Sequence, residues 1–513
     1  MKANEYVISK EKFNFACNSD KIFDKALETK PVTYFRDAFN RFCKNKASIV
    51  ATVIIGMLVL FAIIGPLVSC YTVAYEDPIY AYVQPKNELF YDLGIHFWDG
   101  GIEKEVNEHT FRYYQAIEQE LGRKVIMTEP VVSVKEYMGK TTNLYTFRLD
   151  TYNAVGAEFV LLSTEQYQAL QAYQDEYNVQ VILPITDKSL RPKAEQDETE
   201  ANYWFVTKSG KGGKTEIPAG DFVPAYKDYN GKDLYTSKMR VEGEGVYKYN
   251  YAEPKDNNTN WNVRVDYREY YTYVHHMAND GITEPSFLFG TNNFGKDIYT
   301  CLSTGARFSF ILAVIVSAVN LFVGAIYGAI EGYYGGKIDI LMERFVEILG
   351  SVPFMIVITL LKYHFNVSHV IILFISFFLT GWTGMAGRTR MQFYRFKNQE
   401  YVLVARTLGA SDKRIMFKHI FPNAIGTLIT GSVLVIPGVI FSETSLSYLG
   451  IINLTSGNLT SVGTLLATGQ TYLFTYPHMI LFPAVFISLL MLSFNLFGNG
   501  LRDAFNPSLR GTE

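Results

Sequence analysis

Long uncharged runs are the feature that most constrains what this chain can fold into. Residues 49–71 form a stretch of 23 residues without a charged side chain. A helix of about 20 apolar residues is enough to cross the hydrocarbon core of a bilayer. Further uncharged runs cover residues 308–330, 370–386, 424–441 and 479–500, and a weaker run at 345–361 includes Glu347. The pattern predicts an α-helical polytopic membrane protein with six transmembrane helices.

Basic residues close to the ends of these runs predict the orientation of the chain. Cytoplasmic loops of membrane proteins carry an excess of Lys and Arg near the spans. Four such residues precede the first run, namely Arg36, Arg41, Lys44 and Lys46. The segment between the fourth and fifth runs holds eight basic residues against only Glu400 and Asp412. Both segments are therefore expected in the cytoplasm, and six spans return the carboxyl terminus to the same side.

The segment between the first two runs differs in charge from the rest of the chain. Residues 72–302 hold 23 Lys and Arg against 35 Asp and Glu, a balance of −12, while the remainder holds 24 against 15, a balance of +9. Its length is ample for a hydrophobic core. Strand-like runs at 159–163 and 179–185, a helical stretch at 106–121 and turn strings such as SGKGG and YNGKD favour an inserted α+β domain outside the cell.

These patterns together predict the division of the chain into segments. The expected segments are a cytoplasmic amino-terminal segment at 1–46, the first transmembrane helix at 47–71, an extracellular domain at 72–302, a five-helix core at 303–506 with a cytoplasmic loop at 387–423, and a cytoplasmic tail at 507–513.

Several strings imitate motifs that their context does not support. Residues 290–296, GTNNFGK, have the spacing of a phosphate-binding loop, but Asp297 replaces the Ser or Thr that would hold magnesium. The string is also expected outside the cell, and GKGGKT at 210–215 has the same weakness. The four cysteines form no metal-binding pattern. We expect no nucleotide site and no metal site on this chain.

The cysteines at the two ends of the inserted segment leave an alternative open. Cys70 ends a string that imitates a lipoprotein processing site, but about 48 hydrophilic residues precede the apolar run, whereas a cleaved signal begins with a short basic lead. A membrane span with an incidental cysteine is the favoured interpretation. Cys70 and Cys301 bracket the inserted segment, so a disulfide between them stays open as an alternative.

Small and polar residues within the spans are candidates for packing and for a translocation path. Gly324, Gly328 and Gly332 recur on one face of the second span, where they allow close approach either of another span of this chain or of a second subunit. Polar groups at membrane depth are costly and often functional. Asn320, Trp382 and Glu443 are therefore candidates for lining a path, with internal packing or an interfacial position as the alternative.

The loop between the fourth and fifth spans carries the most specific signal. Residues 400–426, EYVLVARTLGASDKRIMFKHIFPNAIG, predict a short helix that stops at Gly409, and a second helix that begins with Ser411 as its N-cap and ends before Pro422. A lipid-facing helix pair is one interpretation. Small residues at the turn favour the other, a rigid elbow that docks into a partner protein.

This loop resembles the Glu-Ala-Ala loop of ABC importer permeases, in which a short coupling helix sits in a cleft of the ATPase subunit. The residues that match are Ala405, Arg406, Leu408, Gly409, Ala410, Ser411, Ile420 and Pro422. Leu403 and Val404 stand where the family has its Glu-Ala pair, and Glu400 lies three residues earlier. The departure concerns the polar detail of docking and not the elbow itself.

Five further segments extend the resemblance to the second permease subunit of oligopeptide, dipeptide and nickel importers. They are GTNNFGKDIYTCLSTGARFSF at 290–310, GYYGGKIDILMERFVEILGSVPF at 332–354, GWTGMAGRTR at 381–390, SETSLSYLG at 442–450 and FNLFGNGLRDAFNPSLR at 494–510. With the first span they cover the membrane half of the chain. Residues 72–302 depart from the usual short family member.

The resemblance implies the fold of an ABC type I importer permease that translocates oligopeptides and has no catalytic group. It implies that this chain binds no cofactor, and that ATP and magnesium bind two separate ATPase subunits. A homologous second permease, an extracellular peptide-binding lipoprotein and membrane lipid are the other expected partners, and no nucleic acid is expected. The alternative is a mechanotransmitting ABC membrane protein, or a sensor, whose external domain is the working part. A secondary transporter would show repeated halves, which this sequence lacks.

Overall fold

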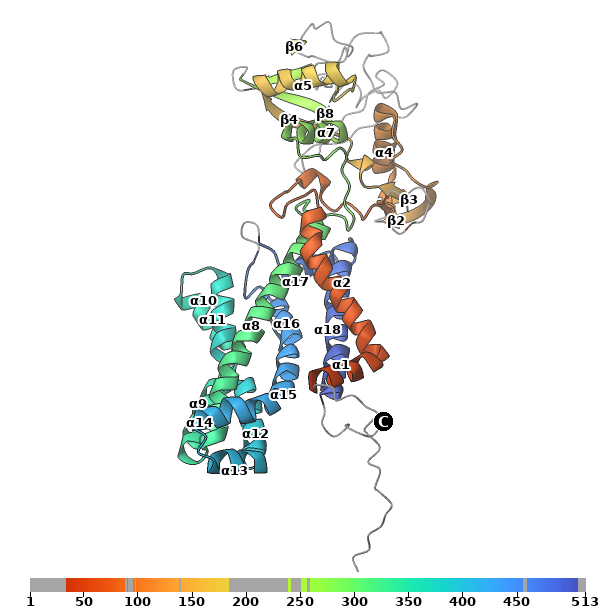
Figure 1. The fold of residues 1–513 in the computed structure, drawn as a ribbon. Coiled ribbons are helices and arrows are strands. Elements are labelled where there is room, and N and C mark those ends of the chain that lie inside the picture. Colours follow the sequence, from red (N-terminus) through yellow and green to blue (C-terminus); the bar gives the residue numbers. More distant parts are fainter. Residues whose placement is uncertain are drawn as a thin grey trace, which may run out of the picture.

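The computed structural model describes residues 34–87, 90, 96, 98–137, 140–183, 239–240, 251–255, 259–454 and 459–505. Most of the predicted amino-terminal segment, the whole carboxyl-terminal tail, the string at 210–215 and the two turn strings lie outside these residues. A bundle of helices forms the membrane part, and an α+β region stands at one end of the bundle (Figure 1).

The described helices of the membrane part follow one another in the order of the predicted spans. They are α1 (Tyr34–Lys44), α2 (Lys46–Val68), α8 (Ile298–Tyr334), α9 (Gly336–Ser351), α10 (Phe354–His364), α11 (His369–Gly381), α12 (Thr383–Phe396), α13 (Glu400–Thr407), α14 (Asp412–Arg414), α15 (Phe421–Val433), α16 (Val435–Tyr448), α17 (Val462–Thr471) and α18 (His478–Ala504). A π-helical turn, Ile415–Ile420, joins α14 to α15.

The predicted polytopic helical fold is confirmed. In the described part of the chain, five helical segments are long and apolar enough to cross a membrane, namely α2, α8, α11 with α12, α14 to α16, and α18. The third predicted span is instead a pair of helices, α9 and α10, bent by 74°. Pro353 explains the break, because proline has no amide hydrogen and disfavours helical geometry at the preceding residue. Val352 accordingly has an extended ψ of 120°.

Helix α8 is longer than its uncharged run, with 37 residues. Its amino end is fixed by Asp297, whose carboxylate accepts hydrogen bonds from the amides of Tyr299 (3.3 Å) and Thr300 (2.9 Å). Its other end is Gly335, with a φ of +66°. The helix therefore begins inside the stretch that the sequence assigns to the external domain.

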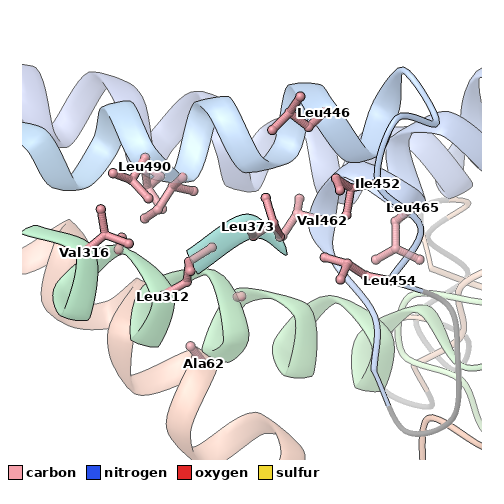
Figure 2. Close-up of a cluster of buried hydrophobic side chains, with 14 of the residues drawn as sticks. Ala62, Leu312, Val316, Leu373, Leu446, Ile452, Leu454, Val462, Leu465 and Leu490 are labelled. Carbon is pink, nitrogen blue, oxygen red and sulfur yellow. The ribbon is translucent and has the colours of Figure 1, made fainter. Parts of the chain in front are cut away.

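A large apolar cluster holds many of the helices together. Figure 2 shows that side chains from elements far apart in the sequence meet in it, including Ala62 of α2, Leu312 and Val316 of α8, Leu373 of α11, Leu446 of α16, Val462 and Leu465 of α17, and Leu490 of α18. All are buried. Helix α17 lies within this cluster and so forms part of the bundle itself.

The first lobe of the α+β region is a three-stranded antiparallel sheet with a helix on it. The order is β1 (Gly101–Asn107), β3 (Lys140–Asp150), β2 (Val131–Tyr137), and α4 (Glu108–Leu121) packs on β1 and β3. The expected helix at 106–121 begins two residues late because Val106 pairs with Tyr145 in the sheet. Asn107 then caps the helix, accepting the Thr110 amide hydrogen at 2.8 Å.

The second lobe is an antiparallel sheet of strands of different lengths, centred on β8 (Asn260–Asp266). Its path runs β4 (Ala157–Ser163), β8, β7 (Tyr251–Lys255), β6 (Met239–Arg240), and β5 (Ile182–Leu183) also pairs with β8. Helices α5 (Thr164–Tyr177) and α7 (Tyr267–Ala278) accompany it. The predicted strand at 159–163 lies within β4, whereas the described part of the run at 179–185 forms only the short strand β5. The α+β assignment is confirmed.

A buried aromatic cluster joins the two lobes to the helices, and we call it the hub. It comprises Tyr71, Tyr80, Val83, Tyr152, Val155, Tyr271, Ile282 and Phe287. Tyr71, just after α2, stacks on Phe287 at a ring distance of 4.8 Å, and its hydroxyl lies 2.9 Å from the hydroxyl of Tyr271. Either hydroxyl of this pair can be the donor.

The string that imitates a phosphate loop is part of the same joint. Gly290 and Gly295 have φ values of +74° and +73°, and Thr291 accepts the Val83 amide hydrogen at 2.9 Å. Its carbonyl oxygen lies 3.1 Å from Nε2 of His478 at the start of α18. The string thus connects the hub to α8 and α18. Close by, Cys70 and Cys301 are both free, so the structure contains no disulfide between them.

Candidate functional site

The segment from Glu400 to Pro422 forms a sharp turn at the end of the bundle opposite the α+β region, and we call it the elbow (Figure 1). Helix α13 ends at Thr407, and Gly409 takes a left-handed φ of +79° that favours glycine. The amide of Gly409 donates to the carbonyl of Arg406 at 3.0 Å, and that of Ala410 donates to Ala405 at 3.1 Å. These bonds close the first helix as the sequence predicts.

The second half of the elbow differs from the sequence prediction. Ser411 stands at the amino end of α14, but its side chain makes no capping hydrogen bond. The predicted helix end before Pro422 is wrong, because the helical chain runs on through the π-helical turn into α15. Proline is tolerated in the first turn of a helix, where its missing amide hydrogen has no role. Just before Pro422, the π-helical turn has backbone hydrogen bonds between residues five apart in place of the usual four.

One face of the elbow is buried against the ends of α8 and α12. Val402, Ile415 and Ile420 are fully buried in a cluster with Phe393 of α12 and Tyr333 of α8. The hydroxyl of Tyr333 also donates to the carboxylate of Asp412 at 2.6 Å. The guanidinium of Arg406 lies 5.8 Å from the centre of the Tyr333 ring. These contacts fix the elbow to the end of α8.

The rest of the elbow is exposed and carries both apolar and charged side chains. Leu408, beside the turn, is 82% exposed, and four other apolar residues are also exposed, namely Tyr401, Leu403, Val404 and Phe417. Among the predicted docking residues, Glu400, Arg406, Gly409, Ser411 and Pro422 are exposed, Ala410 is half-buried and Ala405 is buried. Contiguous apolar surface bordered by polar residues is typical of a protein interaction site.

An ion-pair cluster beside the elbow was not anticipated from the sequence. Arg390 of α12 donates to both carboxylate oxygens of Asp339 in α9, at 2.6 and 3.0 Å, and lies 3.3 Å from the buried Glu331 of α8. Tyr394 donates to the same Asp339 at 2.7 Å. The cluster ties α9 to α12 and α8. The signal in the sequence that could have indicated this cluster is that Glu331 and Asp339 are acidic residues in the largely apolar membrane half of the chain.

Comparison with known proteins gives two matching families. The family described as "Binding-protein-dependent transport system inner membrane component" matches residues 321–511, and "N-terminal TM domain of oligopeptide transport permease C" matches residues 33–85. The oligopeptide transport system permease protein OppC of Bacillus subtilis is 41% identical over 222 residues, which are 43% of this chain and 72% of that protein. The dipeptide transport system permease protein DppC of the same organism is 37% identical over 243 residues, 46% of this chain and 75% of that protein.

A third relative agrees with these two. The OppC protein of Haemophilus influenzae is 38% identical over 223 residues, covering 44% of this chain and 71% of that protein. The chain belongs to the permease family of binding-protein-dependent ABC transporters. The permease is therefore a multi-pass transport component and not an enzyme, and membership implies ATPase and binding-protein partners. Residues 86–320 lie between the two matched regions and are covered by neither.

The glycine stripe of the permease lies at a contact between two of its own helices. Added Cβ atoms would lie 2.7 Å from the Trp382 carbonyl oxygen at Gly324 and 2.1 Å from the Ala386 carbonyl oxygen at Gly328. At Gly332 the atom would lie 2.7 Å from the carbonyl oxygen of Arg390. The stripe therefore brings the backbones of α8 and α12 together, as small residues do in membrane helices.

The three candidate path residues occupy two separate places in the permease. Asn320 and Trp382 lie near each other where α8 meets α11 and α12, since a Cβ at Gly381 would lie 2.4 Å from Nδ2 of Asn320. Asn320 is buried beside an apolar pocket of about 290 Å³, and no described residue is hydrogen-bonded to its Oδ1. Trp382 is also buried, with its ring 4.8 Å from that of Tyr327.

Glu443 lies near the carboxyl end of α16 and is buried among the helices. Its side chain is fully buried in α16, where it accepts hydrogen bonds from Ser309 of α8 (2.7 Å) and from Ser447 (3.0 Å). Ser309 and Asn320 are 11 residues apart on α8, which is about 16 Å along a helix. The structure thus brings Asn320 and Trp382 together and leaves Glu443 apart from them.

Proposed function

We propose that the permease is one of two homologous membrane subunits of an importer that carries oligopeptides into the cell. The names of its relatives, which are oligopeptide and dipeptide permeases, support this cargo class. ATP with magnesium binds two separate ATPase subunits, and an extracellular peptide-binding lipoprotein delivers the cargo. The observation that carries the proposal is the exposed apolar face of the elbow around Leu408 and Gly409.

The elbow is suited to receive movement from an ATPase subunit. Its buried face fixes it to α8 and α12, while the helical chain Asp412–Tyr448 continues from it for 37 residues, about 55 Å. Because the helical chain runs from α14 through α15 to α16, a displacement at Leu408 is expected to pass along these helices. Tyr333 passes the same displacement to α8 through Asp412.

The orientation of the chain follows from the same proposal. The elbow lies at the carboxyl end of α8 and the α+β region precedes its amino end, so the two stand on opposite sides of the membrane. The excess of Lys and Arg around the elbow favours the cytoplasm for that side. The amino and carboxyl termini are then cytoplasmic, and the acidic α+β region is extracellular.

The α+β region is proposed to contact the binding protein that delivers cargo. It is tethered at both ends, after α2 and before α8, and the hub holds it at the entrance side of the bundle. A delivering protein that approaches the outer end of the helices meets this region first.

Co-purification from membranes tests the docking role of the elbow. Replacing Leu408 with aspartate puts a charge into the apolar face, so the tagged chain is expected to lose its ATPase subunits in mass spectrometry of the purified complex. Phe474, between α17 and α18, is 99% exposed at the other end of the bundle and serves as the matched control. Phe474→Asp is expected to keep the ATPases. Retention of the ATPases by Leu408→Asp would refute docking at the elbow.

A further inference from the structure

A cavity of about 220 Å³, with both polar and apolar walls, lies where the α+β region meets the membrane helices. It is bounded by the segment after α2, by the joint before α8, and by α17. Helix α17 approaches α8 closely here, since a Cβ at Gly305 would lie 3.0 Å from the carbonyl carbon of Ser461. The residues used below are Glu76, Phe294, Lys296, Thr460, Thr464 and Thr468, all of which line the cavity.

The cavity has an exposed rim and a buried floor. The Glu76 side chain is 51% exposed and Phe294 is also exposed, whereas Thr460 and Thr464 are buried. Pockets that enclose a whole drug-sized ligand measure about 300–1,000 Å³. A space of about 220 Å³ is smaller than these, but much larger than the roughly 30 Å³ that one water molecule occupies. Its size suits one end of a longer ligand.

The polar groups of the wall are mostly hydrogen-bond acceptors. The hydroxyls of Thr464 and Thr468 donate their hydrogens to carbonyls of their own segment, at 2.8 Å to Ser461 and 3.0 Å to Thr464. The Thr464 oxygen already accepts the amide hydrogen of Ser461 at 3.2 Å, which leaves it one lone pair, while the Thr468 oxygen keeps its lone pairs as acceptors. The carboxylate of Glu76 adds a negative acceptor at the rim. A ligand with a positive charge followed by N–H groups matches this wall.

Lys296, the cation among the described residues that line the wall, is already engaged. The ammonium of Lys296 donates to the carbonyl of Val73 at 3.0 Å and lies 3.1 Å from one carboxylate oxygen of Glu76. An ion pair with a half-exposed partner contributes little and leaves the second oxygen of Glu76 free to accept. The acidic balance of residues 72–302 also raises the local concentration of cations.

We propose that this cavity receives the amino-terminal end of the cargo peptide, with the terminal ammonium at Glu76 and the first N–H groups at the threonines of α17. The inference rests on the proposed function, because it assigns an entry site to a peptide importer. Since α17 packs inside the bundle, a peptide held there touches an element that moves with the membrane helices.

Directional cross-linking in the complete complex tests this assignment. In a chain whose four native cysteines are alanine, Thr468→Cys supplies a thiol at the cavity wall. The probes are Cys-Ala-Ala and Ala-Ala-Cys, each activated as a 2-pyridyl disulfide, so that attack by the protein thiolate forms a mixed disulfide and releases pyridine-2-thione. Thr471→Cys, exposed at the end of the same helix, is the matched control. Adducts are quantified by mass spectrometry.

The measured quantity is the yield of adduct. At Thr468→Cys we expect the yield with Cys-Ala-Ala to be at least about fivefold higher than the yield with Ala-Ala-Cys. It should also be at least about fivefold higher than the yield with Cys-Ala-Ala at Thr471→Cys. Glu76→Gln lowers the yield with Cys-Ala-Ala at Thr468→Cys about fivefold, because a charge-assisted hydrogen bond to the ammonium is lost. The inference is overturned if both probes label Thr468→Cys equally, or if Glu76→Gln leaves the yield of adduct unchanged. Every variant must first co-purify with its ATPases, which excludes misfolding as the cause.

Uptake of tri-alanine by the wild-type complex distinguishes a failure of the entry site from a failure of the proposed function. Uptake without labelling at Thr468→Cys refutes the entry site and leaves the proposed function standing. A wild-type complex that contains its ATPases and binding protein but takes up no peptide refutes the proposed function and the entry site with it.

Discussion

Tyr333 and Asp99 illustrate how single side chains hold separate parts of this permease together. Tyr333 is buried at the end of α8 and donates its hydroxyl hydrogen to Asp412 in the elbow at 2.6 Å. Asp99, in the α+β region, is buried beside β1 and accepts hydrogen bonds from Arg148 (2.7 Å to Nε) and from the Gly101 amide (2.8 Å). The contacts of Tyr333 with Asp412 and of Asp99 with Arg148 each join residues that lie far apart in the sequence.

Replacing Tyr333 with phenylalanine removes one hydrogen bond to a carboxylate, worth about 2 kcal/mol, and leaves the ring in place. We expect Tyr333→Phe to keep its ATPase subunits, because the exposed face of the elbow is unchanged, but to lower peptide uptake per ATP hydrolysed. The measurement is uptake and hydrolysis in the same proteoliposomes. Tyr334→Phe, at the exposed neighbouring position, is the control. Unchanged coupling in Tyr333→Phe would show that α8 receives no movement through Asp412.

Asp99 gives the external region a defined response to acid. Burial raises the pKa of Asp99, but the hydrogen bonds from Arg148 and Gly101 outweigh it and hold the pKa below the usual value. Asp99 therefore has a lower pKa in the folded than in the unfolded chain, where it is about 3.9. The ionised carboxylate stabilises the fold above about pH 3.9, and this stabilisation is lost as the pH falls below that value. We expect hydrogen-exchange protection of β1 and β3, corrected for the intrinsic rate, to fall below about pH 4.

The variant Arg148→Met isolates this pair at neutral pH. It leaves the buried Asp99 carboxylate unpaired and is expected to destabilise the first lobe by about 3 kcal/mol, which is roughly a hundredfold loss of protection in β1 and β3. Lys135→Met is the control, because the pair of Lys135 with Glu105 is largely exposed and contributes little. Equal protection in the two variants would contradict a structural role for Arg148.

At the scale of elements, the close contact of α8 with α12 sets the geometry behind the elbow. The three glycines of α8 lie against backbone carbonyls and Cβ atoms of α12 and of the residue just before it, so the two helices approach closely. The ion pairs of Arg390 with Asp339 and Glu331 secure the same helices and α9 a short distance away. The elbow therefore rests on a stiff base, which a docking surface needs if it is to pass on a movement.

A single methyl group at Gly328 tests this contact. Its Cβ would lie 2.1 Å from the carbonyl oxygen of Ala386, so α8 and α12 must separate, at a cost of about 2 kcal/mol. Gly387 of α12 has no atom within 4 Å of such a Cβ, and alanine there is expected to be neutral or slightly stabilising. Thermal unfolding of the purified chain in detergent should therefore show a lower Tm for Gly328→Ala only. Equal Tm values would mean that the two helices part easily.

At the scale of the whole molecule, the permease is a helical bundle with two small lobes attached to it at the hub and at neighbouring contacts such as Tyr82 with Tyr476. The part of the second lobe that precedes α7, residues 157–266, leaves and returns at almost the same point, since the amide of Tyr267 donates to the carbonyl of Gly156 at 3.1 Å. The hub residues Tyr71, Tyr80 and Phe287 all lie outside this lobe. The lobe can therefore be removed without cutting the hub itself.

Deleting residues 157–266 and joining Gly156 to Tyr267 through one glycine tests the role proposed for the external region. We expect the shortened chain to retain its ATPases, because the elbow is at the other end of the bundle, and to lose stimulation by the binding protein. ATPase activity with and without the binding protein measures both. Full stimulation of the shortened chain would refute a docking role for the second lobe.

The sequence by itself determined the number and places of the apolar segments, the α+β character of the insertion and the elbow around Gly409. These are local properties: a hydrophobic run has a length, and a glycine with a left-handed φ ends a helix whatever surrounds it. The helix ends were less accurate, since α8 begins ten residues before its uncharged run and α4 begins at Glu108 because Val106 belongs to a strand.

Only the tertiary structure decided what these segments touch. It placed the glycines of α8 against α12, put Glu443 apart from Asn320 and Trp382, and carried the helix of the elbow past Pro422 through a π-helical turn. It also turned the string at 290–297 into the joint between hub and bundle and closed a cavity between Glu76 and α17. Such contacts can join residues 200 positions apart, as with Tyr71 and Tyr271, so no local sequence pattern predicts them.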